Sequence, residues 1–414
     1  MRRQLPAELR EFLQVAGRQA EAQGHNLYLV GGAVRDLLLE RPNTDFDLVL
    51  EGDAPSFARR LARLMRDGSD DLKLSDRVTI HPRFGTAKFQ RGDITIDVVT
   101  ARSETYARPG ALPTVKPGAI RDDLFRRDFT INAMAIELMP ASLGRLLDYF
   151  YGIKDLQRGL IRILHNRSFI DDATRILRAV RYEQRLSFKL EPDTERLLKR
   201  DVSYLDTISG DRIRHELELI CKEDNPEQML GRAQTLGVLR QIHPELKVDG
   251  ATAERLRRAR QQGMTETDIY LSILAYPLDS EAIEGFVERL NITGELKRGV
   301  KQLPRLKAKF PALASPNIAP SAVYRLLQKY HPGAIATCAL AADEPTVRFQ
   351  MERYLNELRY VKTHLDGDAL KALGVKPGPR LGKMLEALRE ARLDGAVNTR
   401  EEEASLVHQL LRED

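Results

Sequence analysis

The chain has 414 residues, of which 42% are hydrophobic and 30% charged, a balance typical of a folded protein with roughly two to four domains. No stretch approaches the roughly 20 apolar residues of a membrane span, and the charged N-terminal residues lack the apolar core of a signal peptide. Cys221 and Cys338 stand far apart without metal-ligand spacing, which indicates free thiols in a reducing compartment, so we expect a cytoplasmic location. The net charge of +5 is compatible with nucleic-acid binding but does not establish it.

The first 150 residues alternate between helical and extended patterns and predict one α/β domain. The helical patterns fall at residues 6–24, 33–40 and 54–66, and the extended ones at 27–30, 45–49, 78–80, 86–89 and 94–99. Residues 101–122 are rich in proline and glycine and predict an irregular loop. From residue 151 the pattern is helical to the end, with helices interrupted at prolines and a proline-rich boundary at 304–320.

A glycine turn and a pair of aspartates lie close together near the start of this domain. Gly31 and Gly32 separate the apolar strand 27–30 from a helix start, where backbone N–H groups and absent side chains suit a phosphate. Asp45 and Asp47 are two apart on the next strand and therefore share one face. Neighbouring carboxylates favour a divalent cation between them. The combination predicts a nucleotidyltransferase, with glycines for the triphosphate and aspartates for the metals.

Two further groups of polar residues lie beside apolar segments of this domain. Asp97 interrupts an apolar strand and is either a third metal-binding acid or a carboxylate that caps the strand or pairs with Arg102. Arg126, Arg127, Asp128 and Asn132 crowd a short element that must abut the core through Phe129, Ile131 and Met134. Structural salt bridging is the alternative reading of this second group.

Residues 170–182 predict a helix with Asp171, Asp172 and Arg175 in one turn and Arg178 and Arg181 further along. A carboxylate accepts hydrogen bonds and a guanidinium donates them, so together they complement the base edge of cytosine or adenine and mismatch uracil and guanine. An exposed helix with surface salt bridges is the alternative. A later glycine-rich turn carries Lys376, Arg380 and Lys383, which predict contact with an RNA backbone or, alternatively, a plain connection between helices.

These motifs together resemble the class II tRNA nucleotidyltransferases, or CCA-adding enzymes, which share their head with bacterial poly(A) polymerases. The matching segments are Leu29-Val-Gly-Gly-Ala-Val-Arg-Asp36 with Asp45-Phe-Asp47, Arg126-Arg-Asp-Phe-Thr-Ile-Asn-Ala133, Asp148 to Gly152, Asp171-Asp-Ala-Thr-Arg175, and Ser209-Gly-Asp-Arg-Ile-Arg-His-Glu-Leu217. The resemblance covers residues 27–220 strongly and the remainder weakly. Asp171 departs from the usual glutamate of the fourth motif.

The resemblance implies a fold and a set of roles. The expected fold class is an α/β nucleotidyltransferase head, with a small mixed sheet, followed by an all-α neck, body and tail, at residues 1–150, 151–220, 221–310 and 311–414. Asp45 and Asp47 would hold two Mg²⁺ ions, Gly31, Gly32 and Arg35 the triphosphate, and Arg126 and Asp128, with Asn132, the ribose. Asp172 and Arg175 would read the base, and Arg178 and Arg181 are further nucleotide-binding candidates. The expected partners are tRNA, ATP and CTP.

The nucleotide added and the reaction type have alternatives. The loop 106–121 and the segment Leu164-His-Asn-Arg-Ser-Phe169 look more like members that add only the terminal A. A poly(A) polymerase of the same family and a non-catalytic RNA-binding protein are the rival functions.

Overall fold

The computed structural model describes residues 5–67, 77–82 and 85–412, so the first residues of the charged N-terminus lie outside the described part. The chain divides into two compact units. The first comprises residues 1–209 and 236–241, and the second comprises 210–235 and 242–414. The predicted division at residues 150, 220 and 310 is finer, and we keep it as a proposal. No helix among the described residues is long and apolar enough to span a membrane.

The head is built on a mixed sheet, as predicted. Its elements are α1 (Ala7–Ala22), β1 (Leu27–Val30), α2 (Gly32–Leu38), β2 (Asp45–Leu50), α3 (Ala54–Asp67), β3 (Arg77–His81), β4 (Thr86–Arg91), β5 (Ile94–Thr100), β6 (Arg102–Thr105), β7 (Thr114–Pro117), α4 (Ile120–Phe125), η2 (Thr130–Asn132), β8 (Ala135–Glu137), η3 (Pro140–Ser142) and β9 (Leu146–Leu147). The seven-stranded sheet has the order β3-β4-β5-β2-β1-β8-β9. Only the β2–β5 pair is parallel among these neighbours.

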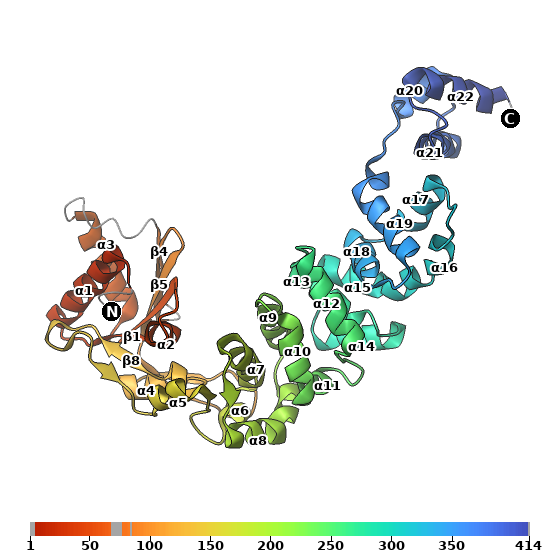
Figure 1. Cartoon of the computed structure of the whole chain (residues 1–414). Coiled ribbons are helices and arrows are strands. Elements are labelled where there is room, and N and C mark those ends of the chain that lie inside the picture. Colours follow the sequence, from red (N-terminus) through yellow and green to blue (C-terminus); the bar gives the residue numbers. More distant parts are fainter. Residues whose placement is uncertain (1–4, 68–76, 83–84, 413–414) are drawn as a thin grey trace. The chain divides into compact units, whose positions relative to one another are not determined.

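Helices α1 and α3 contact each other and cover one face of this sheet (Figure 1). Phe12 of α1 packs edge-on against Phe89 of β4, with ring centroids 5.5 Å apart. The strand register aligns Phe89 with Ile96 and Ile96 with Phe46, so this row of side chains forms the core beneath the helices. Side chains one residue along each strand point to the opposite face.

Residues 101–122, predicted to be irregular, contain a two-stranded ribbon. Strand β6 pairs antiparallel with β7, in the register Arg102↔Pro117 to Thr105↔Thr114. Most of its side chains are partly or fully exposed, so the segment has no apolar alternation of the kind that predicts a strand.

The rest of the first unit is mostly helical. It contains α5 (Gly152–Arg158), β10 (Leu160–Ile161), α6 (Ser168–Asp171), α7 (Thr174–Leu186), β11 (Lys189–Leu190), α8 (Pro192–Asp201) and η4 (Val202–Thr207). Strands β10 and β11 form a small parallel pair. Asp148 accepts hydrogen bonds from the backbone N–H groups of Gly152 and Ile153, at 2.7 and 3.0 Å, and so fixes the start of α5.

The second unit is helical throughout its described residues, as predicted. It contains α9 (Gly210–Cys221), α10 (Pro226–Thr235), the end of α11 (Val238–Ile242), α12 (Gly250–Gln261), α13 (Thr267–Ala275), α14 (Ser280–Arg289), α15 (Gly294–Lys307), α16 (Phe310–Leu313), α17 (Pro320–Leu327), α18 (Pro332–Ala341), α19 (Pro345–Asn356), η5 (Leu358–Tyr360), α20 (Gly367–Ala372), α21 (Pro379–Leu393) and α22 (Arg400–Arg412). Pro304 does not break its helix as predicted but lies inside α15. A small apolar cluster that includes Leu370, Leu388 and Val407 packs the last three helices together.

Candidate active site

A row of carboxylates lies on the sheet face opposite α1 and α3. Asp45 and Asp47 alternate along β2 with the buried Phe46 and Leu48, so both carboxylates point away from the helix-covered core. The parallel register places Asp97 of β5 directly beside Asp47. The structure thus brings a third acid to the predicted pair.

Lys88 of β4 continues this row, because it is opposite Asp97 in the antiparallel β4–β5 pair. Its Nζ is 3.5 Å from Asp97 Oδ2. The alternative partner considered for Asp97 was wrong, since Arg102 pairs with Glu104 at 3.0 Å. The pKa of Asp97 is raised by burial and by Asp45, against the opposing effect of Lys88.

The same crowding of negative charge affects Asp47. Burial raises the pKa of Asp47, and Asp45, Asp97 and Asp123 raise it further, while Arg127 acts in the opposite direction. Proton uptake relieves such repulsion, and so does a bound cation. Within the described residues, no three His, Cys, Asp or Glu side chains form a ready-made metal cluster.

The glycine turn lies beside the carboxylate row. Gly31 has φ +72°, which favours glycine, and its N–H donates to the Met134 carbonyl at 3.3 Å. A Cβ added to Gly31 would lie 3.5 Å from Asp47 Oδ2 and only 2.5 Å from Arg127 Nη1. The turn, the Asp47 carboxylate and Arg127 therefore meet at one point.

Arg127 was named in the crowded element of the sequence but was given no role in the site there. Its Nη2 is 3.1 Å from the fully buried Asp123, which also binds Arg126 at 2.7 Å. The Nε of Arg127 is buried without a hydrogen-bond acceptor among the described residues. The available signal was the spacing of Asp123 from Arg126 and Arg127, three and four residues, which places them on one face at the end of α4.

Arg35, Asn132 and Asp128 form a buried network behind the turn. Arg35 donates to both carboxylate oxygens of Asp36, at 2.8 and 2.9 Å, and to Asn132 Oδ1 at 2.7 Å. Asn132 donates in turn to Asp128 Oδ1 at 3.0 Å. With only 3% of its surface exposed, Arg35 is held within the protein, although its guanidinium lies near Gly32.

Asp128 connects this network to α7. Arg178 donates two hydrogen bonds to Asp128 Oδ2, from Nε at 2.9 Å and from Nη2 at 2.6 Å. Burial alone would raise the pKa of Asp128, but Arg178 and Asn132 outweigh it and lower that pKa to about 2. Asp128 is therefore ionised at every pH at which the protein is expected to work.

Residues 170–182 form two helices and not the single predicted one. Helix α6 ends at Asp171, and Asp172 is extended, with φ −140° and ψ 100°. Asp172 Oδ1 accepts hydrogen bonds from the N–H and the hydroxyl of Thr174, at 3.0 and 2.7 Å, next to the start of α7. Such side-chain capping competes with a continuous helix. Asp172 and Arg175 therefore do not share a helix face as predicted.

Arg175 lines a cavity of about 760 Å³ in the first unit. The cavity is also lined by Tyr106, Arg126, His165 and Asp171. Arg175 donates to the carbonyl oxygen of Arg126 at 2.6 Å. The volume of the cavity falls within the range of about 300–1,000 Å³ that is usual for small-molecule sites.

One wall of this cavity is aromatic. The rings of Phe125 and His165 have centroids 5.1 Å apart and an interplanar angle of 35°. Burial and the nearby Arg175 lower the pKa of His165, which favours its neutral form. Tyr106 donates to Glu104 at 2.9 Å, and Glu104 also binds Arg126 at 3.2 Å. The flat rings of this wall could stack against a nucleobase. Arg126 connects the cavity to Arg127, because both arginines pair with Asp123.

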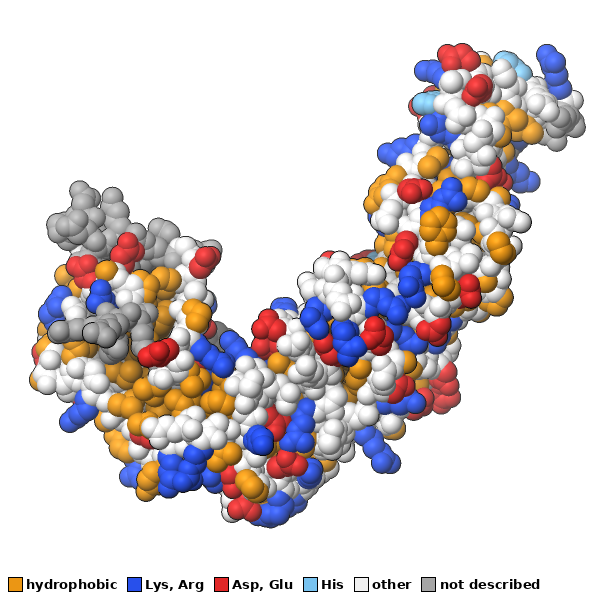
Figure 2. Space-filling view, viewed as in Figure 1, with side chains coloured by type: hydrophobic (Ala, Val, Ile, Leu, Met, Phe, Trp, Pro, Cys, Tyr) orange, Lys and Arg blue, Asp and Glu red, His pale blue; other side chains and the backbone are white. Residues whose placement is uncertain are grey.

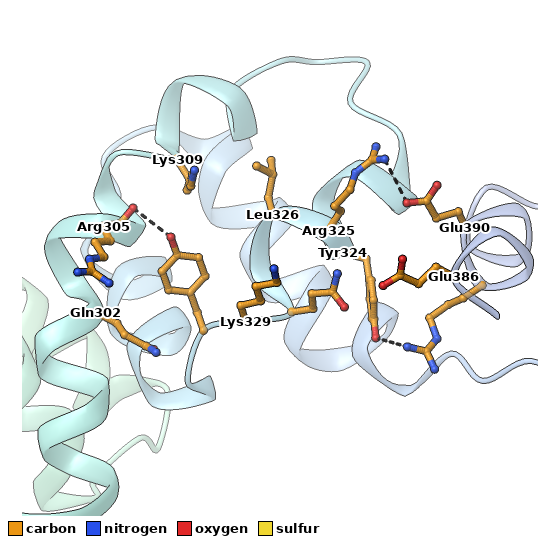
Figure 3. A pocket seen from close by; sticks show the side chains of 12 residues that line it. Gln302, Arg305, Lys309, Tyr324, Arg325, Leu326, Lys329, Glu386 and Glu390 are labelled. Atoms are coloured by element: carbon orange, nitrogen blue, oxygen red, sulfur yellow. Dashed lines mark hydrogen bonds and ion pairs between the residues drawn. The ribbon is translucent and has the colours of Figure 1, made fainter. Parts of the chain in front are cut away.

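A second, cationic pocket of about 540 Å³ lies in the second unit, between α15, α17 and α21 (Figure 3). Figure 3 shows Lys329 between Arg305 on one side and Tyr324 on the other. Arg325 pairs with Glu390 at 3.1 Å, and Arg389 donates to the Tyr324 hydroxyl at 2.8 Å. The predicted RNA-binding residues are Lys376, in the connection between α20 and α21, and Arg380 and Lys383, in α21. All three are exposed.

Two family models match the chain. Residues 27–162 match the poly(A) polymerase head domain, and residues 187–249 match the probable RNA- and SrmB-binding site of polymerase A. The first match contains the glycine turn, the carboxylate row and the Arg126–Asn132 segment.

Curated relatives match almost the whole chain. An A-adding tRNA nucleotidyltransferase of Geobacter sulfurreducens is 34% identical over 99% of this chain, which spans 48% of that protein. An A-adding tRNA nucleotidyltransferase of Halalkalibacterium halodurans is 33% identical, with 95% of this chain and 90% of the relative covered.

Solved structures match over the same extent. A CCA-adding enzyme in its apo form II has a TM-score of 0.83 at 31% identity, covering 98% of this chain and 96% of that one. The Thermotoga maritima CCA-adding enzyme complexed with tRNA has a TM-score of 0.76 at 31% identity, covering 99% and 97%. A CCA-adding enzyme in complex with ATP has a TM-score of 0.81 at 30% identity, covering 99% and 97%. The chain therefore belongs to the tRNA nucleotidyltransferase family.

Proposed function

We propose that this protein transfers nucleotides from ATP and CTP to the 3′ end of tRNA without a template, building or repairing the terminal CCA and releasing pyrophosphate. The main support for this proposal is that Gly31, Asp47 and Arg127 lie close together at one point. A triphosphate on the glycine turn would lie beside carboxylates and a guanidinium. The names of the relatives and neighbours support tRNA as the acceptor and ATP as a donor.

Asp45 and Asp47 are the residues we assign to two Mg²⁺ ions, with Asp97 as a candidate third ligand. The fit is supported by the raised pKa of Asp47, whose burial and acidic neighbours create the negative potential that a divalent cation relieves. Mg²⁺ is commonly held by one or two carboxylates, with substrate phosphates and water completing its shell. When bound, such ions activate the attacking hydroxyl and stabilise the leaving pyrophosphate.

The protein's own groups would position the nucleotide around that centre. Arg127 would offer its Nη1, which lies against the Gly31 turn, to the triphosphate, while Asp123 holds the guanidinium in place. Gly31 and Gly32 let the phosphates approach the backbone closely. Arg35 would support the turn from behind through Asp36 and Asn132 rather than bind phosphate directly.

The base is proposed to occupy the cavity of the first unit, against the Phe125–His165 wall. Arg175 retains donors beyond those used on backbone carbonyls, because a guanidinium has five N–H groups. Asp171 lines the cavity, and Asp172 caps α7 nearby. Either carboxylate can supply the acceptor that selects cytosine and adenine over uracil and guanine.

The acceptor RNA is proposed to contact the second unit. Arg305, Lys309 and Lys329 line its cationic pocket, together with the paired Arg325 and Arg389. Figure 2 shows Lys and Arg side chains gathered in the region of α12 in the same unit. A polyanion with regularly spaced phosphates fits such cations, and Tyr324 adds an aromatic surface. Lys376, Arg380 and Lys383 would extend the contact.

The test uses tRNA that ends before the CCA, after the first C, or after CC, each with labelled CTP or ATP. We expect ordered incorporation that stops at the complete CCA. Asp47→Asn should abolish it, whereas Asp93→Asn, an exposed carboxylate at a turn of the same sheet, should not. Normal incorporation by Asp47→Asn would refute the metal assignment.

A narrower specificity is a second candidate, because the two curated relatives above are named A-adding enzymes. It predicts incorporation only of ATP and only on tRNA ending in CC. Long tails on generic RNA with ATP alone would instead identify a poly(A) polymerase. Absence of pyrophosphate release with all substrates would identify a non-catalytic RNA-binding protein.

A further inference from the structure

Three guanidinium groups surround the ring of one tyrosine behind the proposed nucleotide site. The guanidinium carbons of Arg35, Arg178 and Arg181 lie 5.1, 5.5 and 5.4 Å from the centroid of the Tyr182 ring. Phe129 packs edge-on against the same ring, with centroids 5.9 Å apart. Arg35 belongs to α2, whereas Tyr182 belongs to α7. Through this ring, α7, the helix of Arg175, contacts α2, the helix that follows the glycine turn.

These groups form a closed circuit with the buried polar network. Arg35 binds Asn132, Asn132 binds Asp128, and Asp128 binds Arg178. The Tyr182 ring closes the circuit between Arg178 and Arg35. Cations are attracted to the negative face of an aromatic ring, and this attraction strengthens where water is excluded. The circuit thus holds α2 and α7 in one arrangement.

Each end of the circuit leads directly to a proposed substrate contact. Helix α2 starts at Gly32, so the position of Arg35 fixes the helix that follows the glycine turn. Arg178 is three residues from Arg175 on α7, within one helical turn. Burial opposes the charge on Arg35, but Asp36 and Tyr182 more than compensate, so its pKa is raised and it stays a cation.

We propose that Tyr182 is a positioning residue that couples base selection at Arg175 to triphosphate placement at Gly31 and Gly32. The proposal rests on the function proposed above. When the nucleobase fits the cavity, α7 keeps its position. Tyr182 then holds the glycine turn where the triphosphate is aligned with Asp45 and Asp47. The competing explanation is that Tyr182 is a core aromatic that contributes to stability alone.

The test compares Tyr182→Leu and Tyr182→Phe in single-nucleotide addition to tRNA ending in CC. The kcat and KM for ATP and for GTP are measured separately, together with the melting temperature. We expect Tyr182→Leu to reduce the ATP:GTP ratio of kcat/KM about tenfold, or about 1.4 kcal/mol. Tyr182→Phe keeps the ring face and removes only the hydroxyl, which also interacts with Arg35, so it should retain the ratio within about threefold if the ring carries the coupling. Tyr182→Met carries the same prediction as Tyr182→Leu if the latter does not fold.

Phe57→Leu is the stability control, because Phe57 is an aromatic of α3 outside the circuit and is more buried than the partly exposed Tyr182. It should lower the melting temperature and leave the ATP:GTP ratio unchanged. An unchanged ratio in Tyr182→Leu, or an equal loss in Tyr182→Phe, would overturn the coupling through the ring. If the unmodified protein adds no nucleotide to any tRNA, the proposed function itself fails, which distinguishes the two results.

Discussion

Gly31→Ala is the substitution that most directly tests the geometry of the proposed site. The added Cβ would lie 2.5 Å from Arg127 Nη1, so the guanidinium must move by about 0.5 Å even to reach 3.0 Å. The ion pair with buried Asp123 resists this movement, which displaces Arg127 from the point where the turn meets Asp47. The positive φ of +72° adds backbone strain of about 1–3 kcal/mol.

Gly24→Ala separates these two effects, because Gly24 has φ +70° and its added Cβ would meet no atom within 4 Å. Gly31→Ala should be destabilised more than Gly24→Ala in thermal melts, because it also forces Arg127 to move and because Gly31, with φ +72° and ψ −136°, lies close to a backbone region that essentially only glycine adopts. Only Gly31→Ala should lose activity, by about 10- to 150-fold in kcat/KM for ATP, as expected for a hydrogen bond of about 1.5–3 kcal/mol to a charged group. Undiminished kcat/KM in Gly31→Ala, or an equal loss in Gly24→Ala, would refute the reasoning.

Three further predictions concern carboxylates of the same unit. Asp97→Asn should lower kcat/KM by less than Asp47→Asn and raise the Mg²⁺ concentration needed for half-maximal rate if Asp97 is a third ligand; an unchanged Mg²⁺ titration would exclude that role. Asp171→Asn and Asp172→Asn, compared in ATP and GTP addition, should relax selectivity only for the carboxylate that faces the base, and unchanged selectivity in both would refute a protein template. Because the pKa of Asp128 is lowered to about 2 from an ordinary 3.8, its ionised form contributes about 2 kcal/mol of stability above pH 4, which is lost as the pH falls through 2. Between pH 4 and pH 2, the melting temperature of the unmodified protein should therefore fall more steeply with pH than that of Asp128→Asn. Equal pH dependence of the two melting temperatures would contradict this contribution.

The sequence by itself determined those features of the fold that depend on local periodicity. The apolar run at 27–30, the glycines after it and the alternating run from Asp45 correspond to β1, the turn before α2, and β2. The face shared by Asp45 and Asp47 follows from the two-residue period of any strand. For the same reason the motifs alone indicated the family.

Only the tertiary structure decided which distant residues share the site. Asp97 joins Asp47 because of the parallel β2–β5 register, and a shift by one residue would have placed it on the opposite face. Arg127 reaches Gly31 because Asp123 holds it at the end of α4, and no spacing in the sequence states that contact. Capping by Asp172 divides the predicted helix, and the buried bonds of Arg35 direct it inward, since buried polar groups must find partners. Local pattern therefore specified the turn and the carboxylate pair, while strand register and buried polar pairing specified the groups around them.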